Sequence, residues 1–132
     1  MRVLIAEDDL SSRKFLSSFL SKYAVCDSVV DGMEAVEAFE AAHKEGKPYN
    51  LICLDIMMPK MDGIKTLKAI RDMEGQENIQ SQERAKVIMT TALMETPFIH
   101  NSFDIGCDAY ATKPINLMRF KDLLKKNGFN VG

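Results

Sequence analysis

Short apolar runs alternate with longer amphipathic stretches along the whole chain. Five runs have the length and composition of buried strands, at residues 3–6, 24–30, 51–54, 87–89 and 109–111. We interpret them as continuously apolar rather than alternately apolar and polar, which is typical of strands covered on both faces of a sheet.

The stretches between these runs carry apolar residues at helical spacing. The predicted inward positions are Phe15, Leu16, Phe19, Leu20 and Tyr23, then Val36 and Phe39, then Ile64, Leu67, Ile70 and Met73, and finally Leu117, Phe120, Leu123 and Leu124. Ser11 and Ser12 suit the N-cap of the first helix, and Thr96 and Pro97 suit the start of a helix that stops at Gly106. Five strand–helix units predict an α/β fold, a doubly wound parallel sheet with helices on both faces.

Two segments interrupt this alternation. Asp31 and Gly32 separate the second predicted strand from the next helix, as turn residues do. Residues 74–84 are polar and charged, and we expect them to form an exposed loop or a frayed helix end.

Length and charge narrow the possible functions. The 132 residues fit one domain over residues 1–132, and 17 Lys and Arg against 19 Asp and Glu argue against a nucleic-acid partner. No apolar run is long enough for a signal peptide or for membrane insertion. Cys26, Cys53 and Cys107 lie far apart, so we expect buried thiols in a reducing compartment, the cytoplasm.

Carboxylates follow two of the predicted strands. Glu7, Asp8 and Asp9 come directly after the first strand, and Asp55 comes directly after the third. Ligand sites of open α/β sheets lie beyond the carboxyl ends of strands, so these acids converge if the two strands are neighbours. A solvated acidic loop would explain the triplet alone, but it does not explain an isolated acid that closes an apolar strand. An all-oxygen ligand set favours Mg²⁺ over zinc, and the usual co-ligand of Mg²⁺ is a phosphate oxygen.

Two further strand ends carry polar groups. Thr91 closes the fourth strand, and Lys113 follows the fifth. Taken singly, they read as a turn residue and a surface lysine. Together with the acids, a hydroxyl and an ammonium group indicate a phosphoryl site, in which a carboxylate can itself be the nucleophile.

Four motifs in order carry a family resemblance. They are IAEDD at residues 5–9, LDIMMPKMDG at 54–63, TTA at 90–92 and YATKP at 110–114. With these motifs the chain resembles a receiver domain of two-component response regulators, of the stand-alone single-domain type, over essentially its whole length. The resemblance implies a flavodoxin-like fold with a five-stranded parallel sheet in the order 2-1-3-4-5.

The resemblance also implies roles for the acids. Asp55 corresponds to the residue that accepts the phosphoryl group and also contacts Mg²⁺. Glu7 and Asp8 best match the acidic pair of the family, because Arg13 then falls where receivers often have a basic residue. Asp8 would bind Mg²⁺ directly and Glu7 would bind it through water. The register that pairs Asp8 with Asp9 stays open, which leaves Asp9 as an alternative metal ligand.

The remaining matched positions concern phosphoryl contact and switching. The resemblance implies that Lys113 contacts the phosphoryl group, that the Met57 backbone carbonyl is a further metal ligand and that the bond to Pro114 is cis. Thr91 and Tyr110 correspond to the switch pair, which would bias the surface formed by the fourth helix, the fifth strand and the fifth helix. The alternative for Tyr110 is an ordinary strand aromatic.

We therefore expect a phosphoacceptor module of a two-component phosphorelay. Its donor would be a histidine kinase or a histidine phosphotransfer protein, and its target would be a downstream protein of unknown identity. The only reactions that it would catalyse are its own phosphorylation and dephosphorylation. A phosphatase of the haloacid dehalogenase type would need a second Asp at the position of Met57. A nucleotide-binding protein would need a small-residue loop where residues 7–9 place negative charge. A receiver that no longer accepts phosphate is disfavoured by the intact set of acids with Thr91 and Lys113.

We predict slow loss of the phosphoryl group. Met57 and Leu93 lie two residues beyond Asp55 and Thr91, and neither apolar side chain can orient an attacking water. Timing the decay of the phosphorylated, purified protein tests this prediction. Decay within seconds would contradict it.

Overall fold

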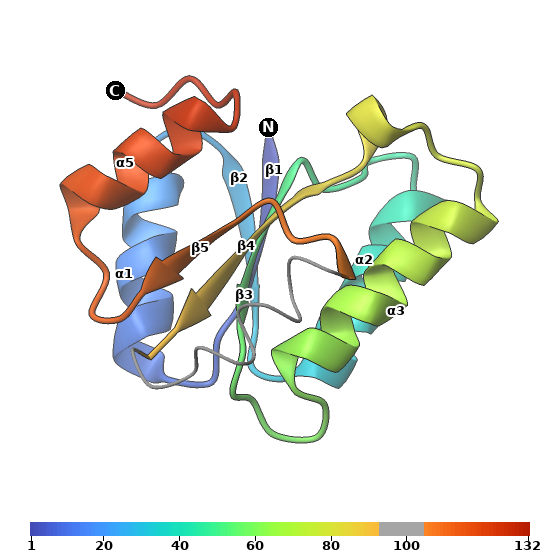
Figure 1. Cartoon of the computed structure of the whole chain (residues 1–132), viewed down its shortest axis with the longest axis horizontal. Helices are drawn as coiled ribbons and strands as arrows, with labels where there is room; N and C mark the ends of the chain where they lie inside the picture. Colours follow the sequence, from blue (N-terminus) through green and yellow to red (C-terminus); the bar gives the residue numbers. More distant parts are fainter. Residues whose placement is uncertain (93–104) are drawn as a thin grey trace.

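The computed structural model describes residues 1–92 and 105–132 (Figure 1). The described elements are β1 (Arg2–Ala6), α1 (Leu10–Leu20), β2 (Val25–Val29), α2 (Gly32–Lys44), β3 (Leu51–Asp55), α3 (Gly63–Gln76), η1 (Ser81–Glu83), β4 (Lys86–Thr91), β5 (Ala109–Thr112) and α5 (Leu117–Lys126). All five predicted strands are present, whereas the predicted helix start at Thr96 and Pro97 and the flanking residue Leu93 lie outside the described residues.

The five strands form one parallel sheet in the order β2-β1-β3-β4-β5, which confirms the predicted fold. β1 and β3 are neighbours, with Ala6 opposite Leu54, and β3 pairs with β4 so that Asp55 lies opposite Thr90. Because the strands are parallel and in register, their carboxyl ends lie along one edge of the sheet.

Helices cover both faces of the sheet, α1 and α5 on one and α2 and α3 on the other (Figure 1). The two-residue period of a strand divides its side chains between the two layers. In β3, Leu51 and Cys53 pack with α1 and α5, whereas Ile52 and Leu54 pack with α2 and α3. Both sets are fully buried, which explains why a continuous apolar run marks this strand.

Three expectations about α1 and β2 were wrong in detail. The N-cap of α1 is Asp9, whose side chain accepts a hydrogen bond from the Ser12 amide, so the helix begins before the predicted serine caps. Phe15, expected to point inward, is 41% exposed. β2 is an edge strand with no fully buried residue, and it carries the polar residues Asp27 and Ser28. An edge strand has fewer neighbours to cover it, so the continuous apolar pattern does not hold there.

The polar stretch at residues 74–84 is more regular than the sequence indicated. α3 continues through Gln76, and a 3₁₀ turn, η1, spans Ser81–Glu83. Glu74, expected in an exposed loop, is only 1% exposed, so this part of the prediction was wrong. The reason is a neighbouring cation that reaches Glu74 from one turn earlier in α3.

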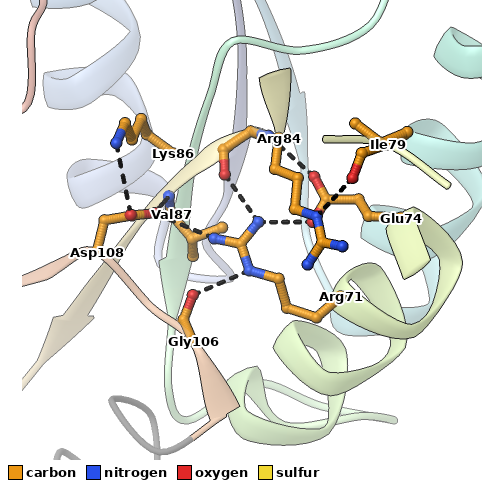
Figure 2. Close-up of polar contacts among 9 residues, drawn as sticks. Arg71, Glu74, Ile79, Arg84, Lys86, Val87, Gly106 and Asp108 are labelled. Carbon is orange, nitrogen blue, oxygen red and sulfur yellow. Dashed lines mark hydrogen bonds and ion pairs between the residues drawn. The ribbon is translucent and has the colours of Figure 1, made fainter. Parts of the chain in front are cut away.

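Arg71 is that cation, and its guanidinium group joins three parts of the chain (Figure 2). Nη1 donates to Glu74 Oε1 at 2.7 Å and to the Ala85 carbonyl at 2.8 Å, while Nη2 contacts Asp108 Oδ2 at 3.0 Å. Nε donates to the Gly106 carbonyl at 2.9 Å. This Arg71 hub ties α3 to the starts of β4 and β5, at the edge of the sheet opposite the strand carboxyl ends.

The cysteines agree with the expectation of buried thiols in two of three cases. Cys53 and Cys107 are buried, and Cys26 on the edge strand is half-buried. None of the helices within residues 1–92 and 105–132 combines the length and the apolar character needed to cross a membrane.

We predict that Arg71→Ala lowers the free energy of unfolding by about 3 kcal/mol, because Glu74 would then hold a buried charge without its cation. Lys68→Ala on the same helix is the matched control. The Lys68–Asp72 pair is 3.1 Å long, but its side chains are 65% and 57% exposed. Its loss should cost less than about 1 kcal/mol. Urea denaturation followed by circular dichroism measures both changes, and equal losses would contradict a stabilising role of the Arg71 hub.

Candidate functional site

The carboxyl ends of four neighbouring strands bring the predicted site residues together. Glu7 and Asp8 follow β1, Asp55 ends β3, Thr91 ends β4 and Lys113 follows β5. The acids of β1 and β3 converge as expected, because these strands are adjacent in the sheet.

Lys113 lies between two of the carboxylates. Its Nζ atom is 2.6 Å from Glu7 Oε1 and 3.2 Å from Asp55 Oδ2. Glu7 is 1% and Asp55 5% exposed, so both carboxylates are largely withdrawn from water. The ammonium group of Lys113 therefore faces buried negative charge and does not extend into open solvent.

Glu7, Asp8 and Asp55 form an acidic group in which one carboxylate oxygen from each lies within 4.8 Å of the others. The Asp9 carboxylate is not part of this group. It accepts a hydrogen bond from the Ser12 amide at 2.9 Å and caps α1. The geometry thus favours the register that pairs Glu7 with Asp8, and an Asp directly before a helix was the signal for the cap.

Arg13 supports the acidic group from α1 through the backbone. Its Nη1 atom donates to the Glu7 carbonyl at 2.8 Å and lies 3.4 Å from the Asp8 carbonyl. Arg13 thereby holds the path of the chain after β1. Sequence reasoning singled out this position but did not reveal that the guanidinium group binds carbonyl oxygens.

Burial and neighbouring charges shift the titration of the site residues. Burial, reinforced by the adjacent Glu7 carboxylate and opposed by the Lys113 ammonium, raises the pKa of Asp55 to about 8. Burial also disfavours the charged form of Lys113, but contact with Glu7 and the charge of Asp55 outweigh it and raise the pKa of Lys113. Backbone hydrogen bonding from Ser12 lowers the pKa of Asp9. Asp55 therefore needs additional positive charge to be fully ionised at neutral pH.

The acidic group fits a hard divalent cation. All of its ligand atoms are carboxylate oxygens, the type that Mg²⁺ prefers. Glu7 Oε1 is buried and forms an ion pair with Lys113. It accepts no hydrogen bond of good geometry from the described residues. Asp8 is exposed, so water has access to the group. Met57, two residues after Asp55, is exposed as well, and metal binding by its backbone carbonyl stays a prediction.

The positions matched to the switch lie next to this site. Thr91 is fully buried, and its Oγ1 donates to the Ala92 carbonyl at 3.0 Å. Tyr110 on β5 is 41% exposed. The peptide bond between Lys113 and Pro114 is cis, as the resemblance implied. Switching by Thr91 and Tyr110 stays a prediction.

We predict that Asp55→Asn stabilises the metal-free protein at alkaline pH by about 1–2 kcal/mol, because the amide removes repulsion from Glu7. An unfolded aspartate loses its proton near about pH 4, whereas Asp55 in the folded protein loses it near pH 8. The folded state binds more protons between these values, so this residue makes the wild type less stable as the pH rises through that range. The Asn variant lacks this contribution.

Urea denaturation in the presence of a chelator, at about pH 5 and about pH 9, measures the effect. Asp122→Asn on the exposed face of α5 controls for the loss of one negative charge, and it should change the pH dependence little. A pH dependence of Asp55→Asn equal to that of the wild type would contradict the raised pKa.

The chain is similar to known receiver domains over almost its full length. A family model described as response regulator receiver domain matches residues 3–125. Chemotaxis protein CheY of Treponema pallidum is 31% identical over an alignment 130 positions long, which covers 94% of this chain and 83% of the relative. Hybrid signal transduction histidine kinase L of Dictyostelium discoideum is 32% identical over 98% of this chain, which spans only 7% of that relative.

Solved structures show the same fold. One is a co-crystal structure of the Saccharomyces cerevisiae histidine phosphotransfer protein Ypd1 with the receiver domain of Ssk1, at 31% identity and a TM-score of 0.79, covering 96% of this chain and 87% of the other. Another is the CheX–CheY–BeF₃–Mg²⁺ complex of Borrelia burgdorferi, at 25% identity and a TM-score of 0.82, covering 98% and 90%. The parallel sheet and the acidic group in contact with Lys113 agree with these similarities. The chain therefore belongs to the response regulator receiver domains of two-component systems.

Proposed function

We propose that Asp55 accepts a phosphoryl group and that this protein thereby works as the phosphoacceptor of a phosphorelay. The observation that carries the proposal is the placement of the Lys113 ammonium 3.2 Å from Asp55 Oδ2 at the edge of the sheet, beside Glu7 and Asp8. Asp55 has a lysine ammonium group on one side and belongs to an acidic group that fits Mg²⁺. A carboxylate in these surroundings is suited to hold a transferred phosphoryl group.

The transfer step assigns a role to each group. A carboxylate oxygen of Asp55 attacks phosphorus, an O–P bond forms, and the P–N bond to the histidine of the donor breaks while that nitrogen takes up a proton. Lys113 balances negative charge that gathers on the phosphoryl oxygens. Mg²⁺ would be held by Asp8, Asp55 and the Met57 carbonyl, and by Glu7 through water. It would supply positive charge that keeps the carboxylate ionised and offsets the charge of the phosphoryl group.

Catalysis in this proposal is confined to the protein's own phosphorylation state. The position two residues beyond Asp55 is Met57, whose thioether cannot protonate a leaving group as a phosphatase acid would. The acids after β1 disfavour a nucleotide, because Glu7 and Asp8 would repel its phosphates. The protein is then a signalling module that turns over no separate substrate.

The donor in this proposal is a histidine kinase or a histidine phosphotransfer protein. Support comes from the Ypd1–Ssk1 co-crystal structure, which contains such a phosphotransfer protein together with a receiver domain. Exposed apolar side chains near the acidic group offer contacts to a protein donor. Leu10 directly follows the acids of β1 and is 54% exposed, and Met57 is 55% exposed.

The output in this proposal is a change in protein binding at one surface. This surface is formed by β5, α5 and the fourth helix that the family resemblance implies between β4 and β5. Buried Thr91 and half-exposed Tyr110 would move together when Asp55 carries a phosphoryl group, and this would alter the surface that a downstream protein meets. Most of the chain between β4 and β5, at residues 93–104, lies outside the described part.

We place the protein in the cytoplasm, in keeping with buried thiols at Cys53 and Cys107.

Incubation of the purified protein with acetyl phosphate and Mg²⁺ tests the proposal. We expect the mass to increase by one phosphoryl group, no labelling of Asp55→Asn, and a labelling rate of Lys113→Ala lower by about 10²-fold. Lys125→Ala, on the exposed end of α5, is the matched control and should be labelled like the wild type. Labelling of Asp55→Asn at the same extent would refute the assignment, and an unlabelled wild type would favour a receiver that works without phosphate.

A further inference from the structure

The loop at residues 56–62 leaves Asp55 and passes directly against the amino end of α2. Gly32, the first residue of α2, lies at this contact. A Cβ atom at this position would lie 2.2 Å from the Met61 carbonyl oxygen and 2.3 Å from Thr66 Oγ1. Both distances are far inside van der Waals contact, so the loop and the first turn of α3, which carries Thr66, lie this close to α2 only because residue 32 has no side chain.

A second contact joins the same two parts of the chain. Asp31, directly before Gly32, is 3% exposed, and its two carboxylate oxygens serve different elements. Oδ1 accepts the Glu34 amide at 2.8 Å and caps α2, whereas Oδ2 lies 3.6 Å from Lys60 Nζ in the loop. Lys60 itself has a φ of 66°, a left-handed conformation that is unfavourable for a lysine. The loop is thus held in a defined shape from the side of α2.

We propose that Asp31 and Gly32 are positioning residues for the phosphoryl site, because they set the place of the loop that carries Met57. The inference rests on the function proposed above, in which Asp55 and the Met57 carbonyl contribute to the Mg²⁺ site. Neither Asp31 nor Gly32 touches the acidic group. They act on it only through the loop.

The far end of the loop is closely tied to Asp55, so a displacement at Met61 has little room to be absorbed there. The Gly63 amide donates to the Ile56 carbonyl at 2.7 Å. A Cβ atom at Gly63 would lie 2.3 Å from the Asp55 carbonyl oxygen, so the backbone passes in close contact there as well. A shift of Met61 is therefore transmitted to residues 55–57.

The loop, rather than α2, is the side that would yield. α2 is anchored in the core by Ala35 and Phe39, which are at most 1% exposed. Met57, Pro59 and Lys60 are exposed, so the loop can shift as a whole toward solvent and take residues 55–57 with it. Metal sites tolerate changes of only about 0.2 Å in ligand distances, and misplacement of a reacting group by about 1 Å can cost about 10²-fold in rate.

The test compares Gly32→Ala with Gly75→Ala. Gly75 lies on the exposed face of α3, and a Cβ there would meet nothing within 4 Å, so alanine is accommodated without contact. Titration with MgCl₂, followed by isothermal calorimetry and by the amide NMR signals of Asp55 and Met57, measures the metal affinity directly. We expect the Mg²⁺ dissociation constant of Gly32→Ala to rise about tenfold or more, and that of Gly75→Ala to match the wild type.

Circular dichroism and urea denaturation show whether each variant is folded at the titration temperature. A folded Gly32→Ala protein with a Mg²⁺ dissociation constant within about twofold of the wild type would overturn the inference, even if its stability is lowered. If Gly32→Ala does not fold, Asp31→Asn decides, since asparagine can keep the cap on α2 while it removes the charge that faces Lys60. A rise of about threefold in its dissociation constant supports the inference, and an unchanged constant overturns it.

The wild type separates the failure of this inference from failure of the proposed function. A wild type that binds no Mg²⁺ and gains no phosphoryl group from acetyl phosphate refutes the proposed function and the inference with it. A wild type that does both, beside a folded Gly32→Ala protein that does both equally well, refutes the positioning role alone.

Discussion

Repulsion among three carboxylates held at one edge of the sheet is the constraint around which this protein is built. Glu7, Asp8 and Asp55 bring oxygens within 4.8 Å of one another, and two of these side chains are almost completely buried. Lys113 offsets part of this charge through its contacts with Glu7 and Asp55. The remaining negative charge creates the need for a cation. Burial, with the adjacent Glu7 carboxylate adding to it, raises the pKa of Asp55 in the same direction, against the charged form.

The balance of charge differs between the two ends of the strands. At the edge where the strands begin, the Arg71 hub pairs one guanidinium group with Glu74 and Asp108 and satisfies the carbonyls around it (Figure 2). At the edge where strands end, carboxylates outnumber the nearby ammonium group. A paired network suits a structural joint, whereas unbalanced charge suits binding of a cation and an anionic phosphoryl group.

Much of the fold could be predicted because strand burial leaves a direct trace in the sequence. The runs that became β1, β3 and β4 are apolar on both faces, since helices cover both. The same reasoning was less accurate where coverage is incomplete. β2 lies at the edge of the sheet, and Phe15 on α1 faces solvent despite its helical spacing. Spacing identifies one face of a helix, but only the neighbouring elements decide how much of that face is covered.

The sequence by itself determined which residue types follow each strand, and therefore that Asp55, Lys113 and the acids after β1 would share one edge of a parallel sheet. Tertiary structure alone decided that Glu74 is buried beside an Arg71 that also binds Asp108 and the Ala85 carbonyl, and that Gly32 lies against a loop that begins about 24 residues later. Both outcomes depend on contacts at atomic distances between separate elements. Such contacts arise from how rigid elements pack, and neither composition nor periodicity encodes them.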